Sequence, residues 1–194
     1  MNNYLEDEID VYNEKIKKQE IKDKKINNKT ISDTIFNECD LSNTTYNNIF
    51  FENVIFEKCD LSNIKLNECS LNNVTINNCK LIGTYFNNNR ITKLAINNCN
   101  CKYLNIIDTK IKESCIIESN LSESSFYNVE IKKLKLTKDD FTLTEFYKTS
   151  LQKVDFSNSI IDGIKITPDC LKGMQVNTLQ ALDLVKILEI EIKE

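Results

Sequence analysis

The sequence contains no histidine, and it has only three glycines and one proline in 194 residues. Without histidine, mixed Cys-His zinc sites are excluded, and the eight cysteines include no CxxC pair of the kind that binds zinc. So few glycines leave no glycine-rich phosphate loop and no nucleophile elbow, because both need glycine at tight turns. We therefore expect no enzymatic activity, no catalytic residue, no metal and no cofactor.

Long apolar runs are also missing. No segment approaches the roughly 20 apolar residues that span a bilayer, and the first residues, MNNYLEDEIDVYNEKIKK, are polar and acidic, unlike a signal peptide. The net charge of −4 argues against a generally cationic protein that binds nucleic acid or membranes. We expect one cytoplasmic domain that does not bind membranes.

The sequence does contain a period of five residues. In IFEKCDLSNIKLNECSLNNVTINNCKLIGTYF, from Ile55 to Phe86, a large apolar residue recurs at every fifth position. The same frame runs from Ile31 to Ile166, and Cys101 is the only one of its 28 positions that is not Ile, Leu, Phe or Tyr. Neither the helical period of 3.6 nor the strand period of two keeps these side chains on one face. The chain must therefore turn a corner every five residues.

The repeat reads CDLSN at Cys39–Asn43 and again at Cys59–Asn63. This unit resembles the A/C-D/N-L-x-x repeat of the pentapeptide-repeat family. The resemblance implies an all-β solenoid, a right-handed quadrilateral β-helix in which four pentapeptides form each coil and a short C-terminal α-helix follows. We place this β-helix over residues 29–167. About seven coils at the strand spacing of roughly 4.8 Å give a shaft on the order of 30–35 Å long.

The cysteines follow the same frame. Cys39, Cys59, Cys79 and Cys99 are spaced twenty residues apart, so in square coils they form one interior column. A redox or soft-metal ladder is one interpretation of such a column. We favour buried, reduced thiols that serve as small apolar side chains.

Two inward positions carry polar residues, Asn89 and Asp139. We expect Asn89 to join a ladder of side-chain hydrogen bonds. A buried carboxylate is costly unless it has partners or a raised pKa. We therefore expect irregular backbone between Lys138 and Asp140.

The C-terminal segment, residues 168–194, abandons the frame at Pro168. Asn177 and Gln180 have the spacing of a capping box, and an apolar helix face follows them. This segment either covers the last coil of a monomer or joins two copies. Because it is similar to the C-terminal end of the Qnr- and MfpA-type quinolone-resistance group, we favour a homodimer. The interface residues implied by that similarity are Val176, Gln180, Ala181, Leu184, Leu188, Ile190 and Ile192.

The N-terminal segment, residues 1–28, is rich in Lys and Glu and keeps the frame only in part. It is either a cap or frayed first coil, or an amphipathic helix, which the spacing of Leu5, Ile9, Tyr12 and Ile16 also suits. The sequence does not separate these two alternatives.

The outward residues can be sorted onto four faces by taking every fourth pentapeptide. One face has a net charge of −3, and the opposite face, which contains the basic band from Arg90 to Lys153, has +3. Resemblance to the Qnr and MfpA group implies a DNA mimic that binds bacterial DNA gyrase or topoisomerase IV and modulates it or protects it from quinolones. The partner-binding residues we predict are the carboxylates of the acidic face, Asp40, Asp60, Glu123, Asp140 and Asp162.

Two other functions use different faces. The protein could be an interaction scaffold for an unrelated protein, with Tyr85, Tyr127 and Tyr147 as the contact strip. The basic band could hold a polyanion, but its aromatic residues are sparse, so ordinary solvation is the simpler interpretation. From the sequence we therefore expect no direct binding of nucleic acid. We attach no function to the 27 asparagines.

Overall fold

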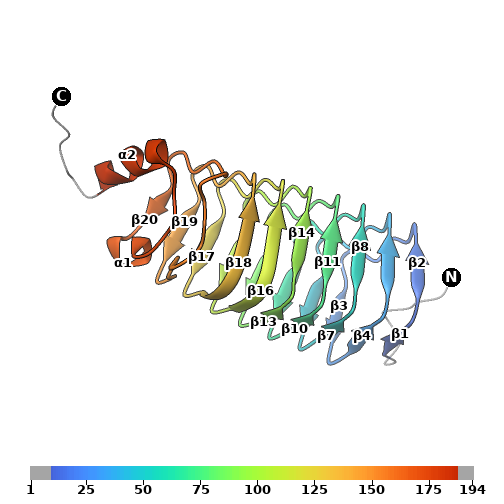
Figure 1. Ribbon diagram of the computed structural model, residues 1–194. Coiled ribbons are helices and arrows are strands. Elements are labelled where there is room, and N and C mark those ends of the chain that lie inside the picture. Colours follow the sequence, from blue (N-terminus) through green and yellow to red (C-terminus); the bar gives the residue numbers. More distant parts are fainter. Residues whose placement is uncertain (1–9, 188–194) are drawn as a thin grey trace.

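A computed structural model describes residues 10–187 of the chain. It is a parallel β-solenoid of about eight coils, stacked in chain order and closed at one end by a C-terminal helix (Figure 1). The predicted β-helix is confirmed, and the estimate of seven coils is close. In the paired strands, each residue lies beside the residue twenty positions later, as the register of Ile31 with Phe51 shows.

Two sides of the solenoid form one 12-stranded sheet. The strands of its first side are β1 (Val11–Tyr12), β4 (Thr30–Ser32), β7 (Phe50–Glu52), β10 (Ser70–Asn72), β13 (Arg90–Thr92), β16 (Lys110–Ile117) and β18 (Glu130–Thr137). The strands β16 and β18 continue around the corner, where the other strands of the second side are β2 (Lys15–Lys17), β5 (Ile35–Asn37), β8 (Ile55–Glu57), β11 (Thr75–Asn77) and β14 (Ala95–Asn97).

An eight-stranded sheet forms a third side. Its strands are β3 (Lys25–Asn27), β6 (Thr45–Asn47), β9 (Lys65–Asn67), β12 (Tyr85–Asn87), β15 (Asn105–Ile107), β17 (Ser125–Tyr127), β19 (Glu145–Tyr147) and β20 (Lys165–Ile166). The fourth side is held by single bridges, one per coil, through Glu20, Asp40, Asp60, Lys80, Asn100, Asn120, Asp140 and Ile160. All four sides therefore repeat at coil spacing.

The core is a stack of the residues that recur at every fifth position. Phe36 lies flat on Phe56 with ring centroids 5.0 Å apart, and Phe126 lies on Phe146 at 4.8 Å. Stacked rings of this kind add to the stabilisation that comes from burying their apolar area. Because each coil buries its neighbours, the interior is continuous from Val11 to Ile166.

The corners of the coils use left-handed backbone. The residue two positions after each core residue has a positive φ, from Asn13 at 53° to Lys153 at 66°. Asparagine tolerates this conformation better than most residues, and many of the asparagines occupy it. Their amides also form ladders between coils, as when Asn63 Nδ2 donates to Asn43 Oδ1 at 3.2 Å. The asparagines therefore have a structural function that we did not predict.

The small inward residues link successive coils by hydrogen bonds. The Cys59 N–H donates to Cys79 Sγ at 3.2 Å, and the Cys79 N–H donates to Cys99 Sγ at 3.4 Å. The predicted column of buried, free cysteines is present. Outside this column, the burial of Cys69 raises the pKa of its thiol to about 11. Within the column, hydrogen bonds from neighbouring thiols lower the pKa of Cys59 and Cys99.

Asn89 takes the role predicted for it. Its Oδ1 accepts from the Cys69 N–H at 2.7 Å, and its Nδ2 donates to the Leu66 carbonyl at 3.0 Å. The two ends of the amide thus satisfy backbone groups in the preceding coils.

The expectation of irregular backbone at Asp139 is wrong. Lys138 has the same positive φ, 57°, as the equivalent residue of other coils, and Asp140 pairs with Asn120 and Ile160 in the regular column. Asp139 fits because the Ser119 N–H donates to its Oδ1 and the Thr137 N–H to its Oδ2, both at 2.9 Å. Burial nevertheless raises the pKa of this carboxyl to about 6, although the same hydrogen bonds lower it.

Strands also precede residue 29. β1, β2 and β3 pair in register with β4, β5 and β6, so Tyr12 and Ile16 lie in strands. Leu5 and Ile9 lie outside the described residues. The coil is retained here because Val11, Ile16 and Ile26 are buried in the common core.

Two helices follow the last strand, α1 (Pro168–Leu171) and α2 (Thr178–Ile187). The capping box predicted at the start of α2 is confirmed. The Asn177 N–H donates to Gln180 Oε1 at 2.9 Å, and the Gln180 N–H donates to Asn177 Oδ1 at 3.0 Å. Between residues 10 and 187, neither helix is long and apolar enough to cross a membrane.

Candidate protein-interaction surface

Carboxylates line the fourth side of the solenoid. Asp40 pairs directly with Asp60 in the next coil, while Asp140 lies in the same column between Asn120 and Ile160. Four coil steps separate Asp60 from Asp140, a distance of roughly 19 Å at the spacing of parallel strands. This column is the first part of the predicted partner-binding surface.

Hydrogen bonds to the turn hold each of these carboxylates in place. Oδ1 of Asp40 accepts from the N–H of Ser42 at 3.0 Å and from its Oγ at 2.6 Å. Oδ1 of Asp140 accepts from the N–H and Oγ1 of Thr142 at 2.9 and 2.6 Å. Asp60 accepts from the Ser62 N–H at 3.0 Å. The CDLSN repeat thus encodes an Asx turn that fixes the aspartate by its Oδ1 atom.

The other oxygen, Oδ2, points to exposed lysines. Asp40 Oδ2 lies 3.7 Å from Lys22 Nζ, and Asp60 Oδ2 lies 3.6 Å from Lys80 Nζ. Burial raises the pKa of Asp40, but the hydrogen bonds from Ser42 and the charge of Lys22 outweigh it, so the net pKa is lowered. Exposed pairs of this kind contribute little stability. The lysines can therefore be displaced by cations of a partner.

The structure divides the five predicted residues into two groups. Asp40 and Asp60 lie near the N-terminal end, whereas Glu123, Asp140 and Asp162 lie near the C-terminal end. The second group is connected through the backbone: the Glu123 N–H donates to the Thr142 carbonyl and the Leu143 N–H donates to that of Asp162, both at 2.8 Å. Lys80 and Lys102 lie between the two groups, and Lys102 is 4.0 Å from Glu123. The sequence indicated one acidic face, but its charge is not uniform.

Glu20 extends the acidic column by one coil, because it pairs with Asp40. We did not predict it, since we placed the β-helix after residue 28. The five-residue frame of Ile16, Ile21 and Ile26 was the signal that could have identified it.

The predicted dimer residues lie at the opposite end from β1, on and around α2. Gln180 is buried and donates from Nε2 to the carbonyls of Phe156 at 3.0 Å and Ser159 at 2.7 Å. Leu184 is buried in the same protomer, and Val176 and Ala181 are half-buried. Leu188, Ile190 and Ile192 lie outside the described residues. The exposed apolar residues of α2 are instead Leu179, at 75% exposure, and Leu182, at 45%.

The aromatic strip on the third side is shorter than predicted. Tyr127 and Tyr147 stack with ring centroids 5.2 Å apart, and Lys148 Nζ lies 5.7 and 5.6 Å from the two rings. Both tyrosines are exposed, whereas Tyr85, two coils before Tyr127, is half-buried. Within the described part of the chain, no group of three or more Cys, Asp or Glu residues is placed to hold a metal ion.

Comparison with known proteins identifies the repeat. Residues 29–106 match the family model described as "Pentapeptide repeat region". No curated protein sequence matches the chain.

Similar solved structures include two trypsin-treated forms of QnrB1, described as a plasmid-mediated fluoroquinolone resistance protein. The first has a TM-score of 0.39 and 18% identity, and covers 92% of this chain and 99% of its own. HetL from the cyanobacterium Nostoc sp. strain PCC 7120, involved in heterocyst differentiation regulation, has a TM-score of 0.29 and 13% identity, and covers 84% of this chain and 87% of its own. At these TM-scores and identities, the likenesses do not bear on function.

Proposed function

We propose that this chain, whose residues 29–106 match the pentapeptide-repeat family model, acts as a DNA-mimicking rod that binds a bacterial type II topoisomerase, DNA gyrase or topoisomerase IV. It would occupy the cationic surface that normally holds DNA, and so modulate the enzyme or protect it from quinolones. The topoisomerase is the partner implied by the resemblance of the sequence to the Qnr and MfpA group.

The observation that carries this proposal is the preorganised acidic column. Asp40, Asp60 and Asp140 are held by turn hydrogen bonds at fixed coil positions, and each uses only Oδ1 to do so. Binding therefore costs little side-chain entropy, because the carboxylates are ordered before a partner arrives. Their Oδ2 atoms remain available to lysine or arginine side chains that otherwise contact phosphates.

Electrostatics would govern such a complex. A partner that neutralises these carboxylates must displace Lys22 and Lys80, whose exposed pairs are weak. Complementary charge mainly accelerates association and sets specificity. Binding should therefore weaken as the salt concentration rises.

We also propose that two copies join through their α2 ends. Eight coils at roughly 4.8 Å give a shaft of about 40 Å, and an end-to-end dimer would be about twice that length. The exposed Leu179 and Leu182 are the apolar groups of α2 that such a contact would cover.

The test is a supercoiling assay with purified bacterial gyrase, with and without ciprofloxacin. The variant combines Asp40→Asn, Asp60→Asn, Glu123→Gln, Asp140→Asn and Asp162→Asn. It should fold, because Asn120 occupies the same column and accepts from the Ser122 N–H at 2.9 Å, as an aspartate does. We expect the wild type to inhibit supercoiling or to rescue it from the drug, and the variant to lose this effect.

A matched variant controls for the change in net charge. It replaces five carboxylates on other faces by amides: Asp33, Glu38, Glu52, Glu57 and Glu68. It should behave as the wild type. Equal loss in both variants, or no wild-type effect on gyrase or topoisomerase IV at any concentration, would reject DNA mimicry.

A second candidate function is an interaction scaffold for a different protein. The observation that favours it is the exposed stack of Tyr127 and Tyr147 beside Lys148, since exposed tyrosines are enriched at protein interfaces. The double variant Tyr127→Ser with Tyr147→Ser separates the two functions. It should leave a topoisomerase effect of the acidic column intact, and it should weaken binding of a protein that docks on the aromatic strip.

A further inference from the structure

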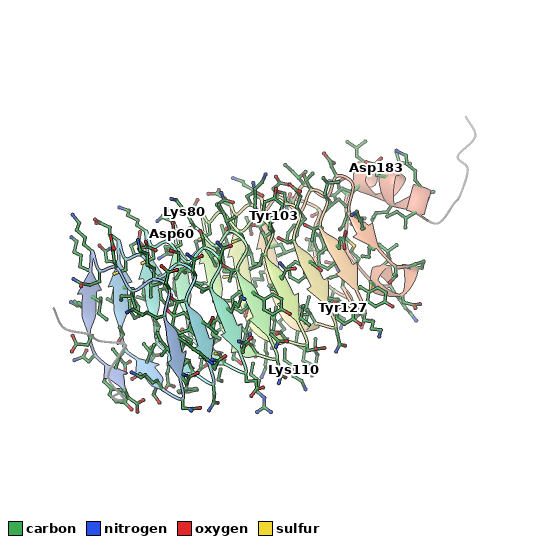
Figure 2. The ribbon with its side chains drawn as sticks, turned by 180° about the vertical axis from the view of Figure 1, so that it is seen from behind. Asp60, Lys80, Tyr103, Lys110, Tyr127 and Asp183 are labelled. Carbon is green, nitrogen blue, oxygen red and sulfur yellow. The ribbon has the colours of Figure 1, made fainter. Side chains whose placement is uncertain are left out.

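The basic band lies on the side of the solenoid formed by β13, β16 and β18. Figure 2 places Lys110 on the edge of the shaft opposite the one that carries Asp60 and Lys80. On this side, between residues 90 and 153, seven cations face two carboxylates, a net charge of +5. The cations are Arg90, Lys93, Lys110, Lys112, Lys132, Lys133 and Lys153.

In-register pairing arranges these residues in columns. Arg90 pairs with Lys110, and Lys110 with Glu130, along one column; Thr92, Lys112 and Lys132 form a parallel one. A groove with a volume of about 310 Å³ lies between the two columns, and the backbone at Ile91 and Ile111 forms its floor. Cationic side chains therefore line both walls of a shallow groove along the shaft.

The carboxylate of Glu130 shows that the two walls can converge on one anion. It lies 3.3 Å from Lys110 Nζ on one wall and 3.0 Å from Lys132 Nζ on the other. The hydrogen bonds from Lys132 and Lys110 lower the pKa of Glu130. One coil earlier, the corresponding position is Lys110 itself, so no carboxylate fills the groove there.

Several cations of the band have no internal counter-ion. Glu113 is shared by Lys112 at 3.7 Å and Lys133 at 3.6 Å. Within residues 10–187, Arg90, Lys93 and Lys153 make no ion pair, and all three are exposed. The sequence alone favours ordinary solvation of the cations in the band. Solvation does not account for their arrangement around a groove whose two carboxylates lie at one end and at one corner.

We propose that this groove binds the phosphate backbone of a nucleic-acid duplex. The band presents cations at the coil spacing. The surface of a duplex has regular negative charge, about one charge per 1.7 Å of its axis. The exposed tyrosine stack lies on the third side, so the band offers no aromatic platform for unpaired bases. The contacts are to phosphates and carry no sequence preference.

The acidic side of a second copy is a poorer partner for this groove. Its carboxylate column is interrupted, because Lys80, Asn100 and Asn120 lie between Asp60 and Asp140. Lateral packing of two rods would therefore oppose the cationic groove to a surface whose negative charge is discontinuous. The proposal is independent of the proposed topoisomerase contact, because the two use opposite sides of the shaft.

Fluorescence anisotropy of the full chain with labelled 20-base-pair duplexes, one DNA and one RNA, tests the proposal. With about four phosphates neutralised, the slope of log K against log salt is about −3.6, so raising salt from about 50 to 200 mM should weaken binding about 150-fold. The triple variant Arg90→Gln, Lys110→Gln, Lys112→Gln removes three cations that line the groove, and it should weaken binding at low salt at least about tenfold. The two duplexes distinguish DNA from RNA as the source of the backbone.

The matched control is Lys25→Gln, Lys58→Gln, Lys65→Gln. These lysines are exposed, lie on other sides of the shaft and change the net charge equally. They should leave duplex affinity within about twofold of the wild type. Equal losses in both triple variants, no binding to either duplex at low salt, or tighter binding to poly-glutamate than to the duplexes would overturn the proposal. The acidic-column variant should retain duplex binding, so failure of the topoisomerase proposal is distinguishable.

Discussion

Asp139 is the residue whose environment differs most from that of its equivalents in other coils. Its column contains Cys99, Ser119 and Ser159, which satisfy backbone groups without carrying charge. Asp139 Oδ1 accepts from the Ser119 N–H, just as Ser119 Oγ accepts from the Cys99 N–H. Its Oδ2, however, accepts from the Thr137 N–H, whereas Ser119 Oγ donates to the Ile117 carbonyl. Asp139 is 1% exposed and has no cationic partner within residues 10–187. Its protonation is therefore linked to the stability of the fold.

Burial raises the folded-state pKa of Asp139 to about 6, from an unfolded value of 3.8. The folded state therefore holds this proton more tightly. The stabilisation from Asp139 is fully present below about pH 4 and is lost as the pH rises through 6, by about 3 kcal/mol in total. Asp139→Asn should remove this dependence, because the amide can adopt the hydrogen-bonding pattern of Asn89.

Urea unfolding of both proteins between pH 4 and 7 measures the effect. The stability difference between Asp139→Asn and wild type should shift in favour of the variant by about 2.4 kcal/mol across this range. Parallel pH profiles for wild type and Asp139→Asn would contradict the prediction.

At the scale of elements, α2 closes the C-terminal end of the core. Gln180 connects the helix to the last coil, since its Nε2 donates to two backbone carbonyls while its Oε1 accepts from the Asn177 N–H. A solenoid needs such a cap because its terminal coil otherwise exposes apolar surface and unpaired backbone groups. The side chain serves both the helix and the shaft.

Gln180→Ala should destabilise the protein by about 1–3 kcal/mol, because it leaves the Ser159 carbonyl without its donor and the Phe156 carbonyl with only the Ser159 N–H. Urea unfolding measures the loss, and hydrogen exchange should show faster exchange in the last coil than in the central coils. Leu182→Ala, at an exposed position of the same helix, should change the stability by less than about 0.5 kcal/mol. Equal effects of the two substitutions would show that Gln180 is not the connection.

At the scale of the whole molecule, the solenoid is a rod with different chemistry on each side and an apolar helix at one end. Leu179 and Leu182 are exposed on α2, while Leu184 is committed to the core of its own protomer. The proposed end-to-end contact therefore depends on the first two residues. Figure 1 shows α2 at the C-terminal end of the shaft, where the proposed contact would form.

The double variant Leu179→Ser with Leu182→Ser should be a monomer under conditions where the wild type is a dimer. Sedimentation equilibrium measures the masses, and circular dichroism should show an unchanged fold because both side chains are exposed. The control, Tyr103→Ser with Ile160→Ser, removes exposed apolar residues from the shaft and should remain dimeric. A monomeric wild type, or a dimeric variant of α2, would contradict this contact.

The repeat could be predicted from the sequence because the residue types within each five-residue unit determine its burial and backbone conformation. Three residues define one side of the coil, as Cys59, Leu61 and Asn63 do. The central one is apolar, the one two positions earlier is small, and the one two positions later tolerates a positive φ. The capping box at Asn177 is equally local. Such features depend on residues within a few positions of one another, so their pattern is visible in the chain.

Other features depend on which residues the coils place twenty positions apart. The sequence shows that Asp139 is an inward carboxylate, but only the N–H groups of Ser119 and Thr137 in the folded coils make a regular backbone possible there. Likewise, only the folded coils show that Lys110 and Lys132 share Glu130. Only the folded chain shows that the Gln180 side chain points inward from a helix that looked apolar on one face. Local patterning thus specifies the period and the core, whereas hydrogen bonds and ion pairs between coils determine which charges remain available to a partner.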